Sequence, residues 1–346
     1  MSRQPDPALD TLLMVPGSDA LAWPAPGGTL FLGARSGPAL NAARRHRPVC
    51  EQGFKPFADA LERDGFALAD ADADARRFAL VMLLAPRQRE ESRALLARAV
   101  ARCAPGGVVL ACAGNKEGAR TLQDDLARLA GPVQALAKNH CRAAWTAPLA
   151  GQVDAALLDE WLALDAPRPI LDGRFTSRPG LFAWDRIDAA SALLASHLPA
   201  DLAGHGADLG AGWGYLAAEV LARCPGVSGL DLFEAQARAL ELARRNLAGA
   251  RVPLGFHWHD ATTGLPGRYD FIVTNPPFHQ GRADQPEIGQ AFIRAAAAAL
   301  RPGGRLLLVA NRHLPYEQAL AGGFGQVRKL ADEGGFKVVE ATRAGA

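Results

Sequence analysis

The stretch that decides the fold is GADLGAGWGYLAAEVLARC, residues 206–224. Its apolar pattern predicts a strand that ends at Asp208 and Leu209, then a turn, then a helix over 215–223. The turn carries three alternating glycines, Gly210, Gly212 and Gly214. Glycines there let the backbone bend tightly and allow a ligand to approach it closely. A strand, a glycine turn and a helix in this order are typical of an α/β domain that holds a nucleotide.

The spacing of the glycines helps to choose between cofactors. A dinucleotide-binding turn has a further Gly or Ala three residues after its second glycine, and Tyr215 occupies that position here. Asp208 precedes the turn, and its carboxylate would repel a pyrophosphate but attract an α-amino group. The pattern therefore favours S-adenosylmethionine over NAD.

Acids near the ends of the next two predicted strands are candidates for holding the nucleoside part of that cofactor. We expect one strand to end at Asp231, 19 residues beyond Gly212, where a carboxylate accepts hydrogen bonds from ribose hydroxyls. Asp231 would also suit the N-cap of the next helix, and Glu234 is the second candidate for the ribose. Asp260 follows a third short strand, where it would either accept from the adenine amine or form a turn.

The segment TNPPFH, residues 274–279, follows a fourth predicted strand. In a doubly wound sheet the carboxyl ends of the strands hold ligands, so Asn275 should lie beside the glycine turn. The Asn275 side-chain oxygen and the Pro276 carbonyl would accept both hydrogens of an exocyclic amine and aim its lone pair at a methyl donor. Phe278 offers a face on which a flipped-out base can stack. The alternative is an ordinary turn at the end of a strand.

Internal similarity indicates a duplicated domain. Three segments recur in the same order, pairing FLGARSG (31–37) with DLGAGWG (208–214), FALVMLLAPR (78–87) with YDFIVTNPPF (269–278), and APGGVVLACAGN (104–115) with RPGGRLLLVANR (301–312). In the first copy, Arg35 stands where the second has Gly212. Phe31 likewise stands where the second copy has Asp208. The first copy thus keeps the apolar strands but lacks the residues of the site.

We expect a linker helix between the two copies, because apolar residues there are spaced for one helical face. These residues are Val153, Ala156, Leu157 and Trp161. Pro167 and Pro169 would end the helix, and we place the boundary near Pro169. The predicted fold class is α/β, with two Rossmann-like domains in tandem. The degenerate copy with its linker helix spans 1–169, and the active copy spans 170–346.

The composition of the 346-residue chain sets few limits on its partners. Lys and Arg number 38 against 36 Asp and Glu, so the net charge of +2 does not indicate a nucleic-acid binder. The basic run ARRHRP (43–48) is either a phosphate-binding patch or a solvated helix end. The five cysteines lack metal-ligand spacing, so we expect reduced thiols and no metal. The polar N-terminus and the short apolar runs predict a cytoplasmic protein.

Five segments carry a resemblance to a known family: RPGLFAWDRID (178–188), DLGAGWG (208–214), TNPPFH (274–279), ANRHLPY (310–316) and GGFKVVEATR (334–343). The second half resembles the class I S-adenosylmethionine-dependent methyltransferases that have an N-P-P-[YF] motif. The whole chain resembles more closely the bacterial ribosomal RNA guanine-N2 methyltransferases of the RsmC and RlmG group. Members of that group also have an inactive N-terminal copy fused to an active C-terminal one.

The resemblance implies methyl transfer from S-adenosylmethionine to the exocyclic N2 amine of a guanine in ribosomal RNA. The chain length is closer to that of the members that act on 16S rRNA in the small subunit. The amine-binding residues implied are Asn275, Pro276 and Phe278. The cofactor site implied comprises Asp208, Gly210, Gly212, Gly214 and Asp231, with Asp260 as a further candidate. Ribosomal RNA or a ribosomal subunit is the expected partner, and we expect a monomer.

Pro277 and His279 of the TNPPFH segment are candidates for contacting the RNA. Arg312 of the ANRHLPY segment either contacts the RNA or is solvated surface. The segment LFAWDRID (181–188) departs from the commoner F-S-R-D-G-L-D pattern at Ala183 and Trp184. It either covers the cofactor or contacts the RNA, or it is a simple strap between the domains.

Other functions share parts of this pattern. Guanine N2 in 23S rRNA is one alternative, and N-methylation of adenine or protein glutamine is another, because the same motif serves those amines. A third alternative is an RNA-binding module with two inert copies. The intact acid and glycines of the second half oppose that last interpretation.

Overall fold

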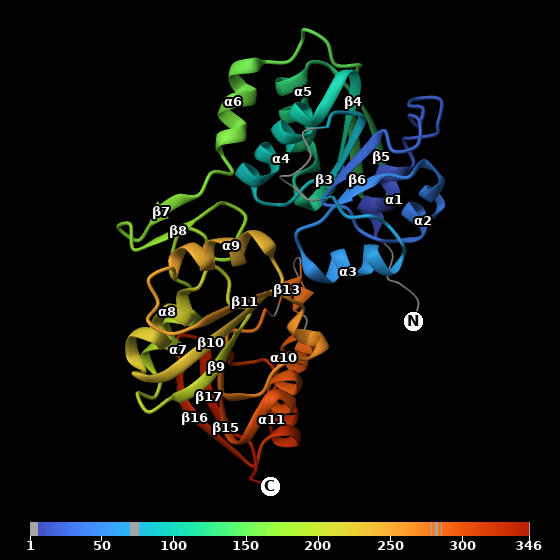
Figure 1. The fold of residues 1–346 in the computed structure, drawn as a ribbon. Coiled ribbons are helices and arrows are strands. Elements are labelled where there is room, and N and C mark those ends of the chain that lie inside the picture. Colours follow the sequence, from blue (N-terminus) through green and yellow to red (C-terminus); the bar gives the residue numbers. More distant parts are fainter. Residues whose placement is uncertain (1–5, 70–75, 278, 281–282, 285, 346) are drawn as a thin grey trace. The chain divides into compact units, whose positions relative to one another are not determined.

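The computed structural model describes residues 6–69, 76–277, 279–280, 283–284 and 286–345. The chain forms two compact units, each with its own sheet and core (Figure 1). The first unit comprises Met1–Ala166 and Arg178–Gly180, and the second comprises Pro167–Ser177 and Leu181–Ala346. The chain therefore passes into the second unit at Pro167 and returns to the first only for Arg178–Gly180.

The second unit contains a mixed sheet with the strand order β11-β10-β9-β12-β15-β17-β16. Its strands are β9 (Ala203–Leu209), β10 (Gly226–Glu234), β11 (Leu254–Trp258), β12 (Tyr269–Thr274), β15 (Leu300–Asn311), β16 (Gln326–Glu333) and β17 (Phe336–Thr342). Strands β11, β10, β9, β12 and β15 run parallel, whereas β17 is antiparallel to both of its neighbours. The parallel strands all end at one edge of the sheet, which is where such folds bind ligands.

Helices cover both faces of this sheet. They are α7 (Ala189–Ser196), α8 (Tyr215–Arg223), α9 (Ala237–Asn246), α10 (Pro286–Ala299) and α11 (Glu317–Gly323), with the 3-10 turn η3 (Ala261–Thr263). Helices α7, α8 and α9 bury their apolar side chains against one face, and α10 and α11 against the other. Two short hairpins complete the unit: β7 (Arg168–Ile170) with β8 (Phe175–Ser177), and β13 (His279–Gln280) with β14 (Ala283–Asp284).

The first unit repeats this architecture with a shorter sheet of strand order β2-β1-β3-β4-β6-β5. Its strands are β1 (Thr29–Leu32), β2 (Val49–Glu51), β3 (Phe78–Leu84), β4 (Cys103–Gly114), β5 (Val133–Lys138) and β6 (Cys141–Thr146). Its helices are α1 (Pro7–Leu13), α2 (Pro38–Ala42), α3 (Lys55–Arg63), α4 (Arg89–Arg102), α5 (Ala119–Ala130) and α6 (Ala155–Ala163), with the 3-10 turns η1 (Arg44–His46) and η2 (Asn115–Glu117). An isolated parallel bridge between Cys50 and Leu68 stands in the place that β11 has in the second sheet.

The three repeated sequence segments lie on equivalent strands of the two sheets. Strands β1, β3 and β4 hold the places in the first sheet that β9, β12 and β15 hold in the second. In each unit a 14-residue helix, α4 or α10, leads into the last of these strands. The tandem α/β fold predicted from the sequence is therefore confirmed.

Two element boundaries differ from the sequence-based prediction. Strand β10 continues to Glu234 instead of ending at Asp231, because the following Leu232 and Phe233 are buried and keep pairing with β9. Helix α6 begins after Val153 rather than containing it, because Asp154 is the N-cap and its side chain caps the first turn. The start and end of α8 and the end of β9 lie where the sequence places them.

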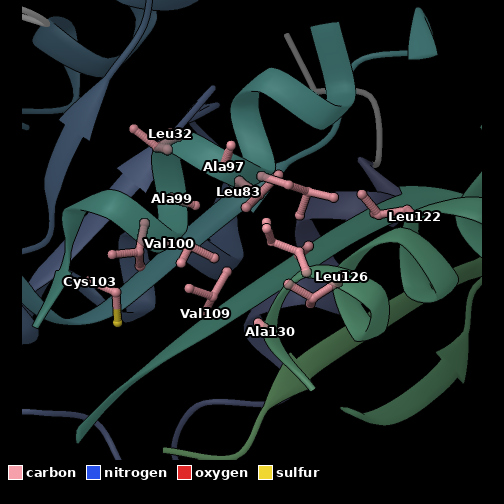
Figure 2. Close-up of a cluster of buried hydrophobic side chains, with 14 of the residues drawn as sticks. Leu32, Leu83, Ala97, Ala99, Val100, Cys103, Val109, Leu122, Leu126 and Ala130 are labelled. Carbon is pink, nitrogen blue, oxygen red and sulfur yellow. The ribbon is translucent and has the colours of Figure 1, made fainter. Parts of the chain in front are cut away.

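In the part of the chain that the structure describes, no helix combines the length and the hydrophobicity needed to span a bilayer. The cores of the two units instead lie between helices and sheets. Figure 2 shows one such core in the first unit, where Leu83 and Val109 of the sheet pack near Val100, Leu122 and Leu126 of α4 and α5. All of these side chains are buried. The first copy thus preserves its packing.

Replacing Leu126 with Ala should destabilise the first unit, because this side chain is fully buried and a cavity would remain. The free energy of unfolding should fall by about 2 to 5 kcal/mol, measured by urea denaturation. Leu162→Ala is the matched control, because Leu162 of α6 is 39% exposed and its truncation should change the free energy little. Equal denaturation midpoints for the two variants would contradict the assignment of this core.

Candidate active site

The glycine turn between β9 and α8 adopts a conformation that other residues avoid. Gly210, Gly212 and Gly214 have φ angles of +71°, +55° and +94°, in the left-handed region where side chains are strained. A Cβ atom placed at Gly212 would have nothing within 4 Å. The turn therefore leaves room for a ligand directly against its backbone.

Parallel pairing of β9 with β12 brings the TNPPFH segment to this turn. Thr274 pairs with Leu209, and the buried Thr274 hydroxyl donates a 2.8 Å hydrogen bond to the Leu209 carbonyl. A Cβ atom at Gly210 would lie 3.9 Å from the Asn275 carbonyl oxygen and 4.0 Å from Cδ of Pro277. Asn275 thus lies beside the glycine turn, as the strand order requires.

Asp208 is fully buried at the end of β9. Neither carboxylate oxygen makes a hydrogen bond of normal geometry with the described residues. The Ala217 N–H is nevertheless close enough to favour the charged form slightly. Burial raises the pKa of Asp208 to about 8, and repulsion from Glu234 adds to the rise. Loss of hydration makes the charged form of this buried carboxyl group costly. A positively charged ligand nearby would compensate for that cost.

The acid at the end of β10 is Glu234. Its Oε2 atom accepts a 2.8 Å hydrogen bond from the Gly212 N–H, and its Oε1 atom accepts a 2.7 Å hydrogen bond from the Gln236 N–H. Burial raises the pKa of Glu234, and these backbone donors oppose the rise. The side chain is therefore tied to the glycine turn at the position from which an acid reaches ribose hydroxyls.

The expectation that Asp231 ends its strand is wrong. It lies three residues before the end of β10, which at strand spacing is about 10 Å. Its carboxylate accepts a 3.0 Å hydrogen bond from the Tyr269 hydroxyl and lies 3.5 Å from His205 Nε2 and 3.3 Å from His257 Nε2. Among the described residues, no group of three or more His, Cys, Asp or Glu side chains could hold a metal ion.

Asp260 caps the 3-10 turn η3 that follows β11. Its Oδ1 atom accepts hydrogen bonds from the Thr262 N–H at 2.9 Å and from the Thr262 hydroxyl at 2.6 Å. The structure thus shows the turn-forming role that the sequence allowed. The same residue stands at the carboxyl edge of the sheet, which leaves a ligand contact through its other oxygen open.

The carboxamide of Asn275 is held through its nitrogen. The Nδ2 atom donates to Asp188 Oδ2 at 3.0 Å and to Ser191 Oγ at 2.8 Å. Both amide hydrogens are thereby used. The Oδ1 atom accepts no hydrogen bond from the residues that the structure describes, so it is available to the hydrogens of a ligand.

A cavity that is partly open to solvent lies beside Asn275. Its other walls come from the glycine turn, from the start of α8 and from the segment 182–191. Phe182 in that segment is 66% exposed, and its carbonyl accepts a 3.3 Å hydrogen bond from Trp213 Nε1. Ala183 has a φ angle of +45°, which is strained for an alanine. The segment is therefore a wall of the cavity.

The sequence did not identify Asp188 and Ser191 as residues of the site. A helix-capping signal was present, since Asp188 precedes α7 and accepts from the Ser191 N–H at 2.9 Å. Their contact with Asn275 could not be read locally, because 84 and 87 residues separate the partners.

The remaining predicted site residues divide into three groups. Pro276 is buried and Pro277 is exposed, directly after β12. Phe278 lies outside the described residues, and His279 lies in the short strand β13. Arg312 follows β15 at the same edge of the sheet, but its guanidinium pairs with an aspartate of β16.

The basic run of the first unit forms the 3-10 turn η1. Arg44 donates to the Asp64 carbonyl and so belongs to the packing of this unit. Arg45 and Arg47 are exposed. Arg44 is exposed as well, but its guanidinium already makes the contact with the Asp64 carbonyl.

Comparison with known proteins assigns the family. A family model described as Methyltransferase small domain matches residues 172–340. The ribosomal RNA small subunit methyltransferase C of Pseudomonas aeruginosa is 33% identical over 280 residues, which is 80% of this chain and 82% of that protein. The chain belongs to the ribosomal RNA small subunit methyltransferase C family. The family member from Shewanella baltica is 30% identical over 287 residues, covering 82% of this chain and 78% of that protein.

A solved structure has the same fold. The T. thermophilus 16S rRNA N2 G1207 methyltransferase, determined in complex with AdoMet and guanosine, matches with a TM-score of 0.81. The match covers 98% of this chain and 92% of that chain at 24% identity. It therefore supports the tandem architecture of this family member over nearly its whole length.

The site of this methyltransferase family member fits S-adenosylmethionine. The orphaned Asp208 carboxyl suits a ligand that carries positive charge. The open backbone at Gly212 provides close approach, and Glu234 adds an acid at the neighbouring strand end. These three features are the ones expected for an amino-acid nucleoside rather than a pyrophosphate.

Asp208→Asn should change how stability depends on pH. The folded wild type keeps the Asp208 proton up to a pKa of about 8, whereas an exposed carboxyl loses it near 3.8. Between these values the unfolded state binds fewer protons, so wild-type stability falls as pH rises, by at most about 1.4 kcal/mol per pH unit. The variant lacks this loss. Its melting temperature relative to wild type should rise from pH 5 to pH 8 without cofactor, and parallel curves would contradict the pKa assignment.

Proposed function

We propose that this chain transfers a methyl group from S-adenosylmethionine to the exocyclic N2 amine of a guanine in 16S ribosomal RNA. The Asn275 carboxamide carries the proposal, because its nitrogen is fixed by two acceptors while the residue lines the cavity beside the glycine turn. The names of the relatives support the substrate class. The T. thermophilus protein acts on G1207, and we propose the equivalent guanine here.

The glycine turn and its neighbouring acids would hold the cofactor. Asp208 would balance the positive charge of the ligand, and Glu234 would accept hydrogen bonds from its ribose while keeping its own bond to Gly212. Asp260 is proposed to accept from the adenine amine. When bound, S-adenosylmethionine supplies an electrophilic methyl group on a sulfonium, which a nucleophile attacks in line.

The guanine amine would bind between Asn275 and Pro276. Its nitrogen lone pair is delocalised into the ring, which makes it a poor nucleophile. Hydrogen bonds from its two hydrogens to Asn275 Oδ1 and to the Pro276 carbonyl would draw that pair out of conjugation and direct it at the methyl group. The proline ring fixes the backbone at Pro276, so this acceptor needs no rearrangement as the reaction proceeds. Phe278 is proposed to stack on the base.

We propose that the first unit binds no cofactor. Arg35, which stands in the place of Gly212, pairs with Asp6 at 3.0 Å. Phe31, which stands in the place of Asp208, is fully buried in the core. Both replacements close the site that the second unit keeps open.

Contacts to the rest of the RNA are proposed for residues of both units: Pro277, His279, Arg312, Arg45 and Arg47. Arg312 can contact the RNA only if its guanidinium is shared with, or released from, the ion pair that it forms with Asp332 of β16. We further propose that the protein acts as a monomer in the cytoplasm, where ribosomal subunits are its substrate.

The function is tested by incubating the full-length protein with labelled S-adenosylmethionine and separate 30S and 50S subunits, followed by mass spectrometry of the nucleosides. N2-methylguanosine in 16S rRNA alone is expected. The same product only in 23S rRNA would overturn the choice of subunit, and methylated adenine or glutamine would overturn the choice of amine. Absence of any methylated product would favour an inert RNA-binding protein.

Asn275→Ala should lower turnover about a hundredfold, since losing one polar group aimed at the reacting atom costs roughly 3 kcal/mol. The dissociation constant for S-adenosylhomocysteine, measured by calorimetry, should stay within about threefold of wild type, because no cofactor contact is removed. A variant with wild-type single-turnover rates would refute the role of this carboxamide.

Glu234→Gln should weaken S-adenosylhomocysteine binding about tenfold or more, because hydrogen bonds to a charged acceptor contribute roughly 1.5 to 3 kcal/mol. Asp231→Asn is the matched control, since Asp231 lies inside the sheet and should leave the affinity nearly unchanged. Calorimetry measures both. If Asp231→Asn had the larger effect, the ribose role would return to the residue first expected from the sequence.

A further inference from the structure

We infer that Asp188, together with Ser191, is a positioning residue that fixes the orientation of the Asn275 carboxamide. The inference rests on the function proposed for this site. It assigns to the segment before α7 a specific part in the reaction, beyond forming one wall of the cavity.

The hydrogen bonds allow only one orientation of the carboxamide. A carboxylate can only accept, so Asp188 Oδ2, at 3.0 Å, requires the amide nitrogen of Asn275 on its side. The two ends of a carboxamide are nearly equal in size, and packing alone would not distinguish them. In the flipped orientation, the amide oxygen would face the carboxylate and the NH₂ group would face the amine of the substrate. That orientation places donors against donors and cannot activate the amine.

The Asp188 carboxylate is itself held in place. Its Oδ2 atom also accepts the Ser191 N–H at 2.9 Å, so it is fixed to the first turn of α7. Ser191 is buried, and its hydroxyl accepts the second amide hydrogen at 2.8 Å. The start of α7 therefore presents two acceptors to one NH₂ group, and all three residues line the same cavity.

The charge of Asp188 also affects the far end of the carboxamide. A carboxylate that accepts from an amide nitrogen polarises the amide, which raises the electron density on its oxygen. Asn275 Oδ1 thereby becomes a stronger acceptor for the hydrogens of an amine. The positioning residue acts on the reaction through Asn275.

Three variants of the full-length protein test this inference on 30S subunits. Asp188→Ala should lower kcat about ten- to a hundredfold, because a misplaced catalytic group costs rates of this order. Ser191→Ala should lower it less, since one acceptor remains. Asp188→Asn should recover most of the rate, because its side-chain oxygen can take the place of Oδ2. The dissociation constant for S-adenosylhomocysteine should stay within about threefold throughout.

The matched control is Asp154→Ala, which removes a helix cap of the same kind from α6, where the side chain accepts the Leu157 N–H at 2.9 Å. It should lower thermal stability to an extent similar to Asp188→Ala but leave kcat unchanged. If Asp188→Ala kept the control's kcat at a temperature where both proteins are folded, the positioning role would be overturned.

A second measurement does not depend on turnover. The chain has six asparagines, so the side-chain NH₂ signals of a protein labelled with ¹⁵N-asparagine can be assigned through Asn275→Ala. The Asn275 signal should shift in Asp188→Ala and return close to its wild-type position in Asp188→Asn. An unmoved signal would overturn the inference. Absence of methyltransferase activity in the wild-type protein would overturn the proposed function. An Asn275 signal that does not shift in Asp188→Ala would overturn only the positioning role.

Discussion

The parallel pairing of β9 with β12 is the constraint on which the site depends. Because the two strands are neighbours in register, the chain leaves Leu209 and Thr274 at the same edge of the sheet, although 65 residues separate them. The buried Thr274 hydroxyl secures this junction where the regular ladder ends. A shift of one residue would turn Asn275 to the other face and separate it from Gly210. The order of strands therefore matters more to this site than the local conformation of either motif.

Local patterns were sufficient to predict the parts of the fold that are set locally. Helix α8 and the end of β9 could be placed because glycines and helical spacing mark them within ten residues. The end of β10 could not be placed, because an acid within an apolar run indicates that the strand ends there unless its pairing partners are known. Asp231 lies inside β10, where its carboxylate contacts Tyr269, His205 and His257 from three other strands. Only the sheet shows that its polar side chain has partners there and that Glu234 is the terminal acid.

The least predictable part of the site is the group that orients Asn275. The D-x-x-S pattern from Asp188 to Ser191 reads as a helix cap, and it is one. Its second use, as a pair of acceptors for a carboxamide from another strand, depends on how α7 packs on the sheet beside β15 and β17. Sequence reasoning treats a cap as complete once its helix N–H is satisfied. The carboxylate has capacity for further donors, and the fold uses that capacity at the cavity.

The two copies in this chain allow the cost of the site to be judged within one fold. In the second unit, Asp208 of β9 is fully buried, and neither of its carboxylate oxygens has a hydrogen bond of normal geometry among the described residues. Burial raises its pKa to about 8. The first unit places Phe31 at the corresponding point, fully buried and packed in the core. Stability alone favours the phenylalanine, because an unpartnered buried acid is costly and an apolar ring there is not. The second unit retains the costly residue beside an open glycine turn and a second acid, the half-buried Glu234. Such a local conflict with folding is expected where a ligand supplies the missing partner, and in the first unit Phe31 removes the conflict.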